Sequence, residues 1–246
     1  MKLRSITLAG LCVVVLAALA PSAHAQSEAE FVEVLAGQWE VYDDGYAVDG
    51  KHCVITLKNT KVESDYELSV ESCGLELGML TSWRIADGQL GLVADGTMIA
   101  SLGGNQFRMS GSSNIGAPVI LDRVGETAAM DRILAAYKAS GCYYLGFTST
   151  CVDEAQLAKP AIPPDGSAAR IGILVNLNVR AEAREDANVV GVVPANSCIA
   201  TEVCATASDG VWCRARFGEV SGWLKKLALR QERWPVVTFV NQCQAE

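Results

Sequence analysis

The sequence contains little histidine, no run of basic residues and none of the common catalytic motifs. Only His24 and His52 occur among its 246 residues, which excludes most zinc sites and every mechanism that needs two histidines. The Walker loop and the GxGxxG, HExxH and GxSxG motifs are absent. Lys and Arg total 20 against 28 Asp and Glu, a formal charge of −8, so the clustered cations that nucleic-acid binding needs are missing. These absences favour a binding protein over an enzyme, without a metal or cofactor.

The remaining titratable residues do not form an obvious catalytic group. The acidic pairs Asp43-Asp44 and Glu185-Asp186 fall in predicted turns, where a solvated carboxylate is the ordinary role. His52 stands beside Cys53 at the start of a predicted strand and is expected to be solvated or locally bonded. A hydrolase that uses two carboxylates is therefore only a remote alternative.

The first 25 residues have the pattern of a secretory signal. Two basic residues precede an apolar run over residues 6–20, and Ala23-His24-Ala25 follows, with cleavage expected after Ala25. About 15 apolar residues are fewer than the roughly 20 that a membrane-spanning helix needs. A lipoprotein signal would place a small residue before Cys12, where Leu11 stands. We therefore expect a periplasmic or secreted protein of a bacterial envelope, with no transmembrane segment.

Export gives the cysteines a structural meaning. Eight cysteines follow the signal, an even number in an oxidising compartment, which favours disulfides. They are Cys53, Cys73, Cys142, Cys151, Cys198, Cys204, Cys213 and Cys243. No CxxC pair occurs, so a metal site is disfavoured, although spacing alone leaves 105 possible pairings.

Residues 26–124 have the pattern of a small antiparallel β domain. Tyr66, Leu68 and Val70 alternate with polar residues, and Asp-Gly pairs separate the short apolar segments. The predicted strands cover residues 38–43, 52–58, 66–72, 82–86, 89–94, 98–102, 106–110 and 118–123. Eight short strands at this spacing predict a closed barrel or a sandwich.

A helical connector is predicted over residues 125–168. After Thr127, apolar residues from Met130 to Tyr137 repeat at helical spacing, and Gly141 supplies a stop signal. Cys142 and Cys151 then bracket a loop that is short enough to be bridged locally. Four residues, Pro160, Pro163, Pro164 and Gly166, make the following stretch a stiff linker.

A second β block is predicted over residues 169–230, followed by a tail over residues 231–246. Its strands are expected at residues 171–175, 177–180, 188–193, 198–206, 211–217 and 222–227. If Ser208-Asp209 is a two-residue loop, Cys204 lies opposite Cys213 on the neighbouring strand, where a bridge is feasible. This leaves Cys198 and Cys243, whose pairing would tie the tail back onto the block.

The first block resembles the Inh-type inhibitors of serralysin-like zinc metalloproteases. The resemblance lies in the order of residues 35–40 (LAGQWE), Cys53 and Cys73, residues 82–84 (SWR) and residues 119–123 (VILDR). It implies an eight-stranded barrel with a Cys53–Cys73 disulfide. Trp39 and Trp83 are expected in its core, because buried aromatic residues dominate small barrels.

The same resemblance implies an inhibitory segment before the barrel that enters the protease cleft toward its zinc. The corresponding candidate residues here are Gln26, Ser27, Glu28, Ala29 and Glu30. Two features oppose this role. Gln26 can cyclise and lose its basic amine, and the apolar residues of the segment are also compatible with a short helix that covers the barrel.

The second block resembles bacterial SH3-type domains through residues 177–180, 189–194, 210–215 and 221–224. This resemblance implies a small, partly open barrel that binds peptidoglycan or peptides. Trp212 and Trp223 are the candidate groove residues, because an aromatic wall suits sugars or peptides, although burial of both is an equal alternative.

Together these features predict an exported all-β protein: an eight-stranded antiparallel barrel, a short helical connector with its own disulfide, and a small SH3-like barrel. The expected function is inhibition of a protease, a metalloprotease by the resemblance, through steric occlusion of its cleft, with the SH3-like module binding the envelope or a peptide. The alternative is a non-inhibitory envelope protein that binds peptide or peptidoglycan.

Overall fold

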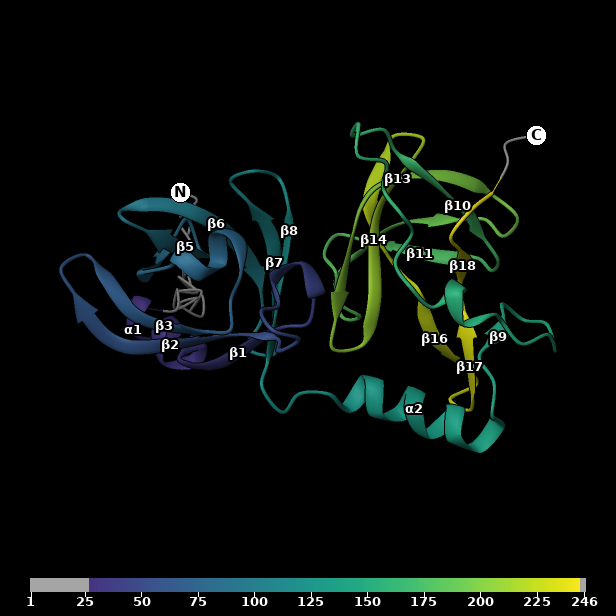
Figure 1. The fold of residues 1–246 in the computed structure, drawn as a ribbon, viewed down its shortest axis with the longest axis horizontal. Helices are drawn as coiled ribbons and strands as arrows, with labels where there is room; N and C mark the ends of the chain where they lie inside the picture. Colours follow the sequence, from purple (N-terminus) through teal and green to yellow (C-terminus); the bar gives the residue numbers. More distant parts are fainter. Residues whose placement is uncertain (1–26, 244–246) are drawn as a thin grey trace, which may run out of the picture.

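The computed structural model describes residues 27–243. Two β-rich units lie side by side, and helix α2 leads from the first unit along one side of the second (Figure 1). The first unit is a closed barrel of strands β1 to β8, and the second is built on a seven-stranded sheet. The predicted all-β fold with an eight-stranded antiparallel barrel is confirmed.

Each barrel strand pairs with its neighbour in sequence, and β1 also pairs with β8, which closes the ring without an edge strand. The strands are β1 (Gly37–Val41), β2 (Cys53–Val62), β3 (Asp65–Glu71), β4 (Ser82–Ala86), β5 (Gln89–Ala94), β6 (Thr97–Gly104), β7 (Arg108–Ser113) and β8 (Pro118–Arg123). The helical elements of this unit are α1 (Glu28–Leu35), η1 (Asp44–Tyr46) and η2 (Leu75–Met79).

Trp39 and Trp83 lie fully buried in the barrel core, as predicted. Burial of an indole is favourable only when its N–H finds an acceptor. The Trp39 Nε1 donates to the carbonyl of Leu35 at 2.8 Å, and the Trp83 Nε1 donates to the carbonyls of Lys58 and Glu67, each at 3.0 Å. The two rings are therefore fixed in position as well as buried.

Asp-Gly pairs make two of the tight turns between strands, as predicted. Asp87 and Asp95 have φ values of 52° and 47°, and Gly88 and Gly96 after them have 74° and 78°. Aspartate tolerates this left-handed backbone region and glycine adopts it freely. Local sequence therefore determines how β4, β5 and β6 are connected.

Strand β2 is longer than the predicted segment 52–58 and ends at Val62. Alternating burial stops after Leu57, but Lys61 of β2 still pairs with Tyr66 of β3. Backbone pairing therefore continues beyond the packed part of the barrel. Hydrophobic periodicity does not register such an extension.

Helix α2 (Ala128–Ser140) begins and ends where the sequence predicted. Gly141 ends it in the left-handed region at φ 69°, and its N–H donates to the carbonyl of Tyr137. Its buried residue Ile133 packs with Leu227 and Val237 of the second unit.

In the second unit the strand order is β12-β11-β15-β14-β13-β10-β18, and a second sheet has the order β16-β17-β9. After α2, the connector contains β9 (Tyr144–Leu145) and η3 (Glu154–Gln156). The remaining strands are β10 (Ala169–Ile173), β11 (Leu177–Arg180), β12 (Val189–Val193), β13 (Cys198–Ala207), β14 (Gly210–Phe217), β15 (Val220–Lys225), β16 (Leu227–Arg230), β17 (Trp234–Val237) and β18 (Phe239–Val240). The tail thus supplies β17 and β18, and β18 pairs with β10.

Four disulfides join Cys53 to Cys73, Cys142 to Cys151, Cys198 to Cys243 and Cys204 to Cys213. These are the pairs expected from the sequence. Ala207 lies opposite Gly210 and Cys204 opposite Cys213, so the register inferred from the Ser208-Asp209 loop is confirmed.

The two units meet through a buried cluster of charges. Arg108 of β7 forms ion pairs with Asp122 of β8 and, at 2.8 Å, with Asp209 in the β13–β14 turn. Lys225 of β15 approaches Asp209 at 2.8 Å from the other side. Although burial by itself raises the pKa of Asp209, the two cations hold it below its usual range. Asp209 therefore carries a paired charge at the interface.

A second polar contact corrects the solvated-turn role that the sequence suggested for Asp43. This carboxylate is 8% exposed and binds Lys159 Nζ at 2.8 Å. It also accepts the backbone N–H of Thr206 in β13 at 2.9 Å. Asp43 thus ties the barrel to the connector and to the second sheet. By contrast, His52 is locally bonded as expected, with Nδ1 2.8 Å from a carboxylate oxygen of Glu40.

Candidate functional site

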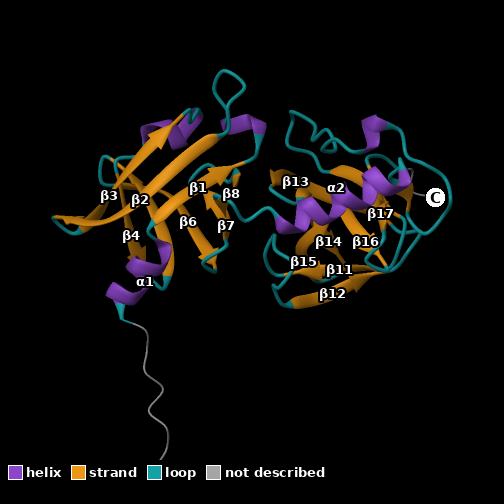
Figure 2. Cartoon of the chain, turned by 90° about the horizontal axis from the view of Figure 1, so that it is seen from below, coloured by secondary structure: helices purple, strands orange, loops and turns teal. Residues whose placement is uncertain are grey.

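Helix α1 covers part of one end of the barrel (Figure 2). The Ser27 side chain accepts the backbone N–H of Glu30 at 3.3 Å, and the Glu30 carboxylate accepts the backbone N–H of Ser27 at 2.7 Å, a complete capping box. Val32 and Leu35 are buried in the barrel core. The capping box therefore begins the helix, and the two buried side chains fix it to the barrel.

The first turn of α1 is also held from its outer side. Glu28 accepts the hydroxyl of Tyr66 at 2.7 Å and Lys61 Nζ at 3.1 Å. The hydrogen bond from Tyr66 lowers the pKa of the Glu28 carboxyl most, and the hydrogen bond and charge of Lys61 lower it further. Both partners lie in the β2–β3 hairpin that extends past the barrel, so this extension has a structural role.

These contacts show a docked helix where the resemblance implied a segment that enters the protease cleft. Gln26 lies outside the described residues, Ser27 is the helix cap, and Glu28, Ala29 and Glu30 form the first turn. The alternative of a short helix covering the barrel is what the structure shows. The reason is the capping box together with two buried apolar anchors, which an extended segment would lose.

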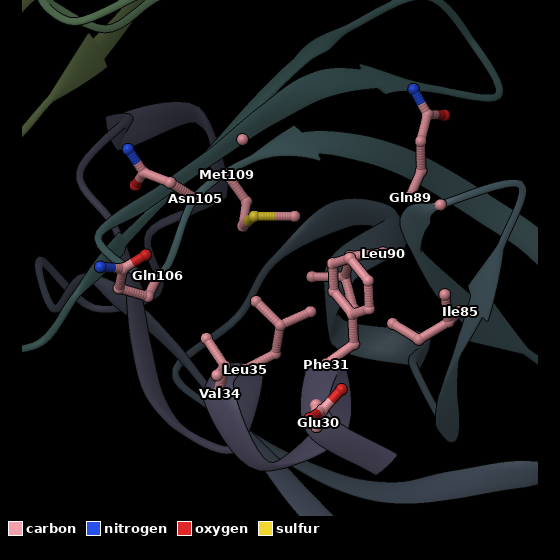
Figure 3. Close-up of a pocket in the computed structure, with 12 residues that line it drawn as sticks. Glu30, Phe31, Val34, Leu35, Ile85, Gln89, Leu90, Asn105, Gln106 and Met109 are labelled. Atoms are coloured by element: carbon pink, nitrogen blue, oxygen red, sulfur yellow. The ribbon is translucent and has the colours of Figure 1, made fainter. Parts of the chain in front are cut away.

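A pocket of about 430 Å³ opens between α1, the β4–β5 turn and the β6–β7 turn (Figure 3). Phe31, Leu90 and Met109 point into it from three different elements, while the amides of Gln89 and Gln106 lie at its rim (Figure 3). A mostly apolar hollow with a few polar groups at the rim suits an apolar group of a ligand or partner. We call this pocket and the surrounding turns the barrel mouth.

Gly104 shapes one side of the barrel mouth. It has φ 149°, and a Cβ at this position would lie 2.1 Å from the carbonyl oxygen of Arg108. Only glycine therefore allows the close approach of β6 and β7 beside the pocket. The sequence signal was present as Gly103-Gly104 before Asn105, but it indicates a turn and not a pocket.

The lining of the barrel mouth is mostly apolar, with amide groups at its rim. In the part of the chain that the structure describes, Glu30 is the only titratable residue that lines the pocket, and its carboxylate accepts the backbone N–H of Ser27. Among residues 27–243, no group of three or more His, Cys, Asp and Glu side chains could hold a metal ion. Its chemistry is therefore that of an apolar contact surface with amide hydrogen bonds.

Trp212 and Trp223, the other predicted site residues, are 0% and 8% exposed and do not line an open groove. They pack with Ile120 of barrel strand β8. The Trp212 Nε1 donates to Asp209 at 2.9 Å, within the charge cluster that joins the two units. Burial, the alternative left open by the sequence, is therefore correct, because the outer wall of the barrel covers this face.

Comparisons with known proteins add little to this geometry. No family model matches the chain, and no curated protein matches it. Among solved structures, the antimicrobial peptidase lysostaphin from Staphylococcus simulans is 14% identical, with 82% of this chain and 93% of that chain covered and a TM-score of 0.25. A similarity at this TM-score carries no argument about function. Within the described residues, no helix has the length and apolar character needed to cross a membrane.

Proposed function

We propose that this protein is an exported protease inhibitor that blocks the cleft of a zinc metalloprotease through the barrel mouth. The observation that carries the proposal is the position of α1. Ser27 begins this helix at the same end of the barrel as the apolar pocket, so residues before Ser27 join the molecule beside a binding surface. A partner that accepts the start of the chain would also contact the barrel mouth.

The rigidity of the barrel supports inhibition by occlusion. The ring of strands is closed, the Cys53–Cys73 bridge joins the start of β2 to the segment after β3, and α1 is fixed by buried apolar residues. A scaffold that is rigid before binding loses little conformational entropy in the complex. The eight-stranded barrel and its disulfide are also what the resemblance to Inh-type inhibitors implies.

In this proposal α1 is the base of the inhibitory element and not part of an extended segment. The capping box holds Ser27 and Glu30 together, so the portion that enters the cleft ends at Ser27. An added residue before Gln26 would then occupy the position closest to the protease metal.

The test uses three forms of the full chain without its first 25 residues. One begins at Gln26, one carries Gly-Ser before Gln26, and the control carries Gly-Ser after Glu246. Each is titrated into a serralysin-like zinc metalloprotease and into a trypsin-like serine protease. We expect the first and the control to inhibit the metalloprotease stoichiometrically, and the N-terminal extension to remove most of the inhibition.

Two results would contradict the proposal in different ways. Equal inhibition by all three forms would place the inhibitory contacts on the barrel and exclude the start of the chain. No inhibition of either protease by any form would overturn the inhibitor proposal and leave the non-inhibitory envelope-binding protein.

A further inference from the structure

The sheet β16-β17-β9 lies on the side of the second unit away from the barrel (Figure 1). Aromatic and arginine side chains contact one another on it. The guanidinium of Arg230 lies 5.0 Å from the ring centre of Phe147, and that of Arg233 lies 4.5 Å from the ring centre of Trp234. Tyr144 meets Trp234 edge-on at 5.8 Å. Phe147 is 59% exposed. A partly exposed cluster of aromatic side chains can mark a binding site.

Two hollows adjoin these side chains. Tyr144, Trp234 and Thr148 line the first, of about 260 Å³, and Phe147 lines the second, of about 380 Å³. Both hollows share Arg230, Gln231 and Val236 in their walls. Arg230 therefore stands between two adjacent subsites. It is held there by the Phe147 ring and by a 3.3 Å hydrogen bond to the Phe147 carbonyl oxygen.

The positive charge at this surface is available to a ligand. Neither Arg230 nor Arg233 forms an ion pair with a carboxylate of residues 27–243, whereas Glu232 between them lies 3.6 Å from Arg132. The chain as a whole has a formal charge of −8, so an arginine without a carboxylate partner among these residues stands out, and Arg230 is the one that lines both hollows. Guanidinium groups bind carboxylates in a bidentate geometry and also stack on flat rings.

We infer that these two hollows form a binding site for a carbohydrate that carries carboxylate groups. The aromatic faces of Trp234 and Phe147 suit the apolar faces of sugar rings, and Arg230 suits a carboxylate between two neighbouring sugars. The Gln231 amide in the wall that the two hollows share supplies hydrogen bonds to sugar hydroxyls.

β9 and β16 form the two edges of this sheet, and the β9 edge is closed to an added peptide strand. Extended peptides are usually bound by adding a strand to a free sheet edge. The outer edge of β9 is already occupied, because Leu145 donates to the Thr150 carbonyl and Val152 donates to the Tyr143 carbonyl, each at 2.8 Å. The inference does not rest on protease inhibition, since the barrel mouth lies on the other unit.

The experiment titrates the full exported chain with an oligomer of galacturonate, a neutral oligosaccharide of equal length, and an oligomer of glutamate. Trp234 is the reporter, because the other four tryptophans are at most 8% exposed. We expect saturable quenching by the galacturonate oligomer alone. Arg230→Gln should weaken this binding by about tenfold or more, the loss of one charged contact, and Trp234→Ala should abolish it by calorimetry.

The matched control is Lys58→Gln, which also removes one exposed positive charge but on the barrel. It should leave binding unchanged. The inference is overturned if the galacturonate oligomer does not bind, if the neutral sugar binds equally well, or if the control weakens binding as much as Arg230→Gln. Equal binding of the glutamate oligomer would show that the surface recognises acidic peptide and not carbohydrate.

Discussion

Replacing Arg108 with methionine should lower the free energy of unfolding by about 3–5 kcal/mol, the usual cost of removing one partner from a buried ion pair. The Arg108 side chain is 9% exposed and bonds to Asp122, Asp209, the Ser208 hydroxyl and the Ala183 carbonyl. Without it, Asp122 would remain 2% exposed with no cation beside it. Urea unfolding followed by circular dichroism measures the change.

Two comparisons make this prediction specific. Lys58→Met removes an exposed ion pair with Glu67, 3.4 Å apart, and should cost less than about 1 kcal/mol. Adding Asp122→Leu to Arg108→Met should recover part of the lost stability, because no unpaired carboxylate then remains at that position. Equal effects of the Arg108 and Lys58 changes would mean that the charge cluster does not stabilise the interface.

Replacing Lys226 with methionine should stabilise the protein near neutral pH and change its pH dependence. Lys226 is 0% exposed, and its amine bonds to the Asn241 side chain and lies 4.8 Å from the Phe239 ring. Burial lowers the pKa of Lys226 to about 7 from an ordinary value near 10.5. Between these values the unfolded chain is protonated and the folded chain is not, so stability rises with pH.

The expected slope in this window is about 1.4 kcal/mol per pH unit for one proton. Lys226→Met has no amine to desolvate, so the difference in unfolding free energy between it and the natural chain should shrink as pH rises from about 7 toward 10.5. Lys138→Met, on the exposed side of α2, is the matched control and should show no such trend. A constant difference for Lys226→Met across this range would contradict the effect of burial.

Much of the fold could be predicted because its signals are local. Alternating residues such as Tyr66 and Leu68 define strands, and pairs such as Asp87-Gly88 define turns that require positive φ. The Ser208-Asp209 loop fixed the register of its hairpin, and so placed Cys204 opposite Cys213.

The site was harder to predict because it depends on how distant elements meet. Trp212 has the sequence pattern of a groove residue, and only the docking of β8 shows that it is an interface residue. Arg108 and Asp209 are 101 positions apart, and no periodic pattern links them. The segment from Ser27 to Leu35 fits both a docked helix and an extended segment, and the contacts of Val32 with the barrel decide between them.

We propose that this protein inhibits a protease by occlusion and is not itself cleaved. The most direct measurement is native mass spectrometry of an equimolar mixture with a serralysin-like metalloprotease, followed by denaturing mass analysis after prolonged incubation. We expect a 1:1 complex in which both chains keep their full masses and the protease is inactive. A free, active protease, or a chain cleaved in the course of inhibition, would contradict it.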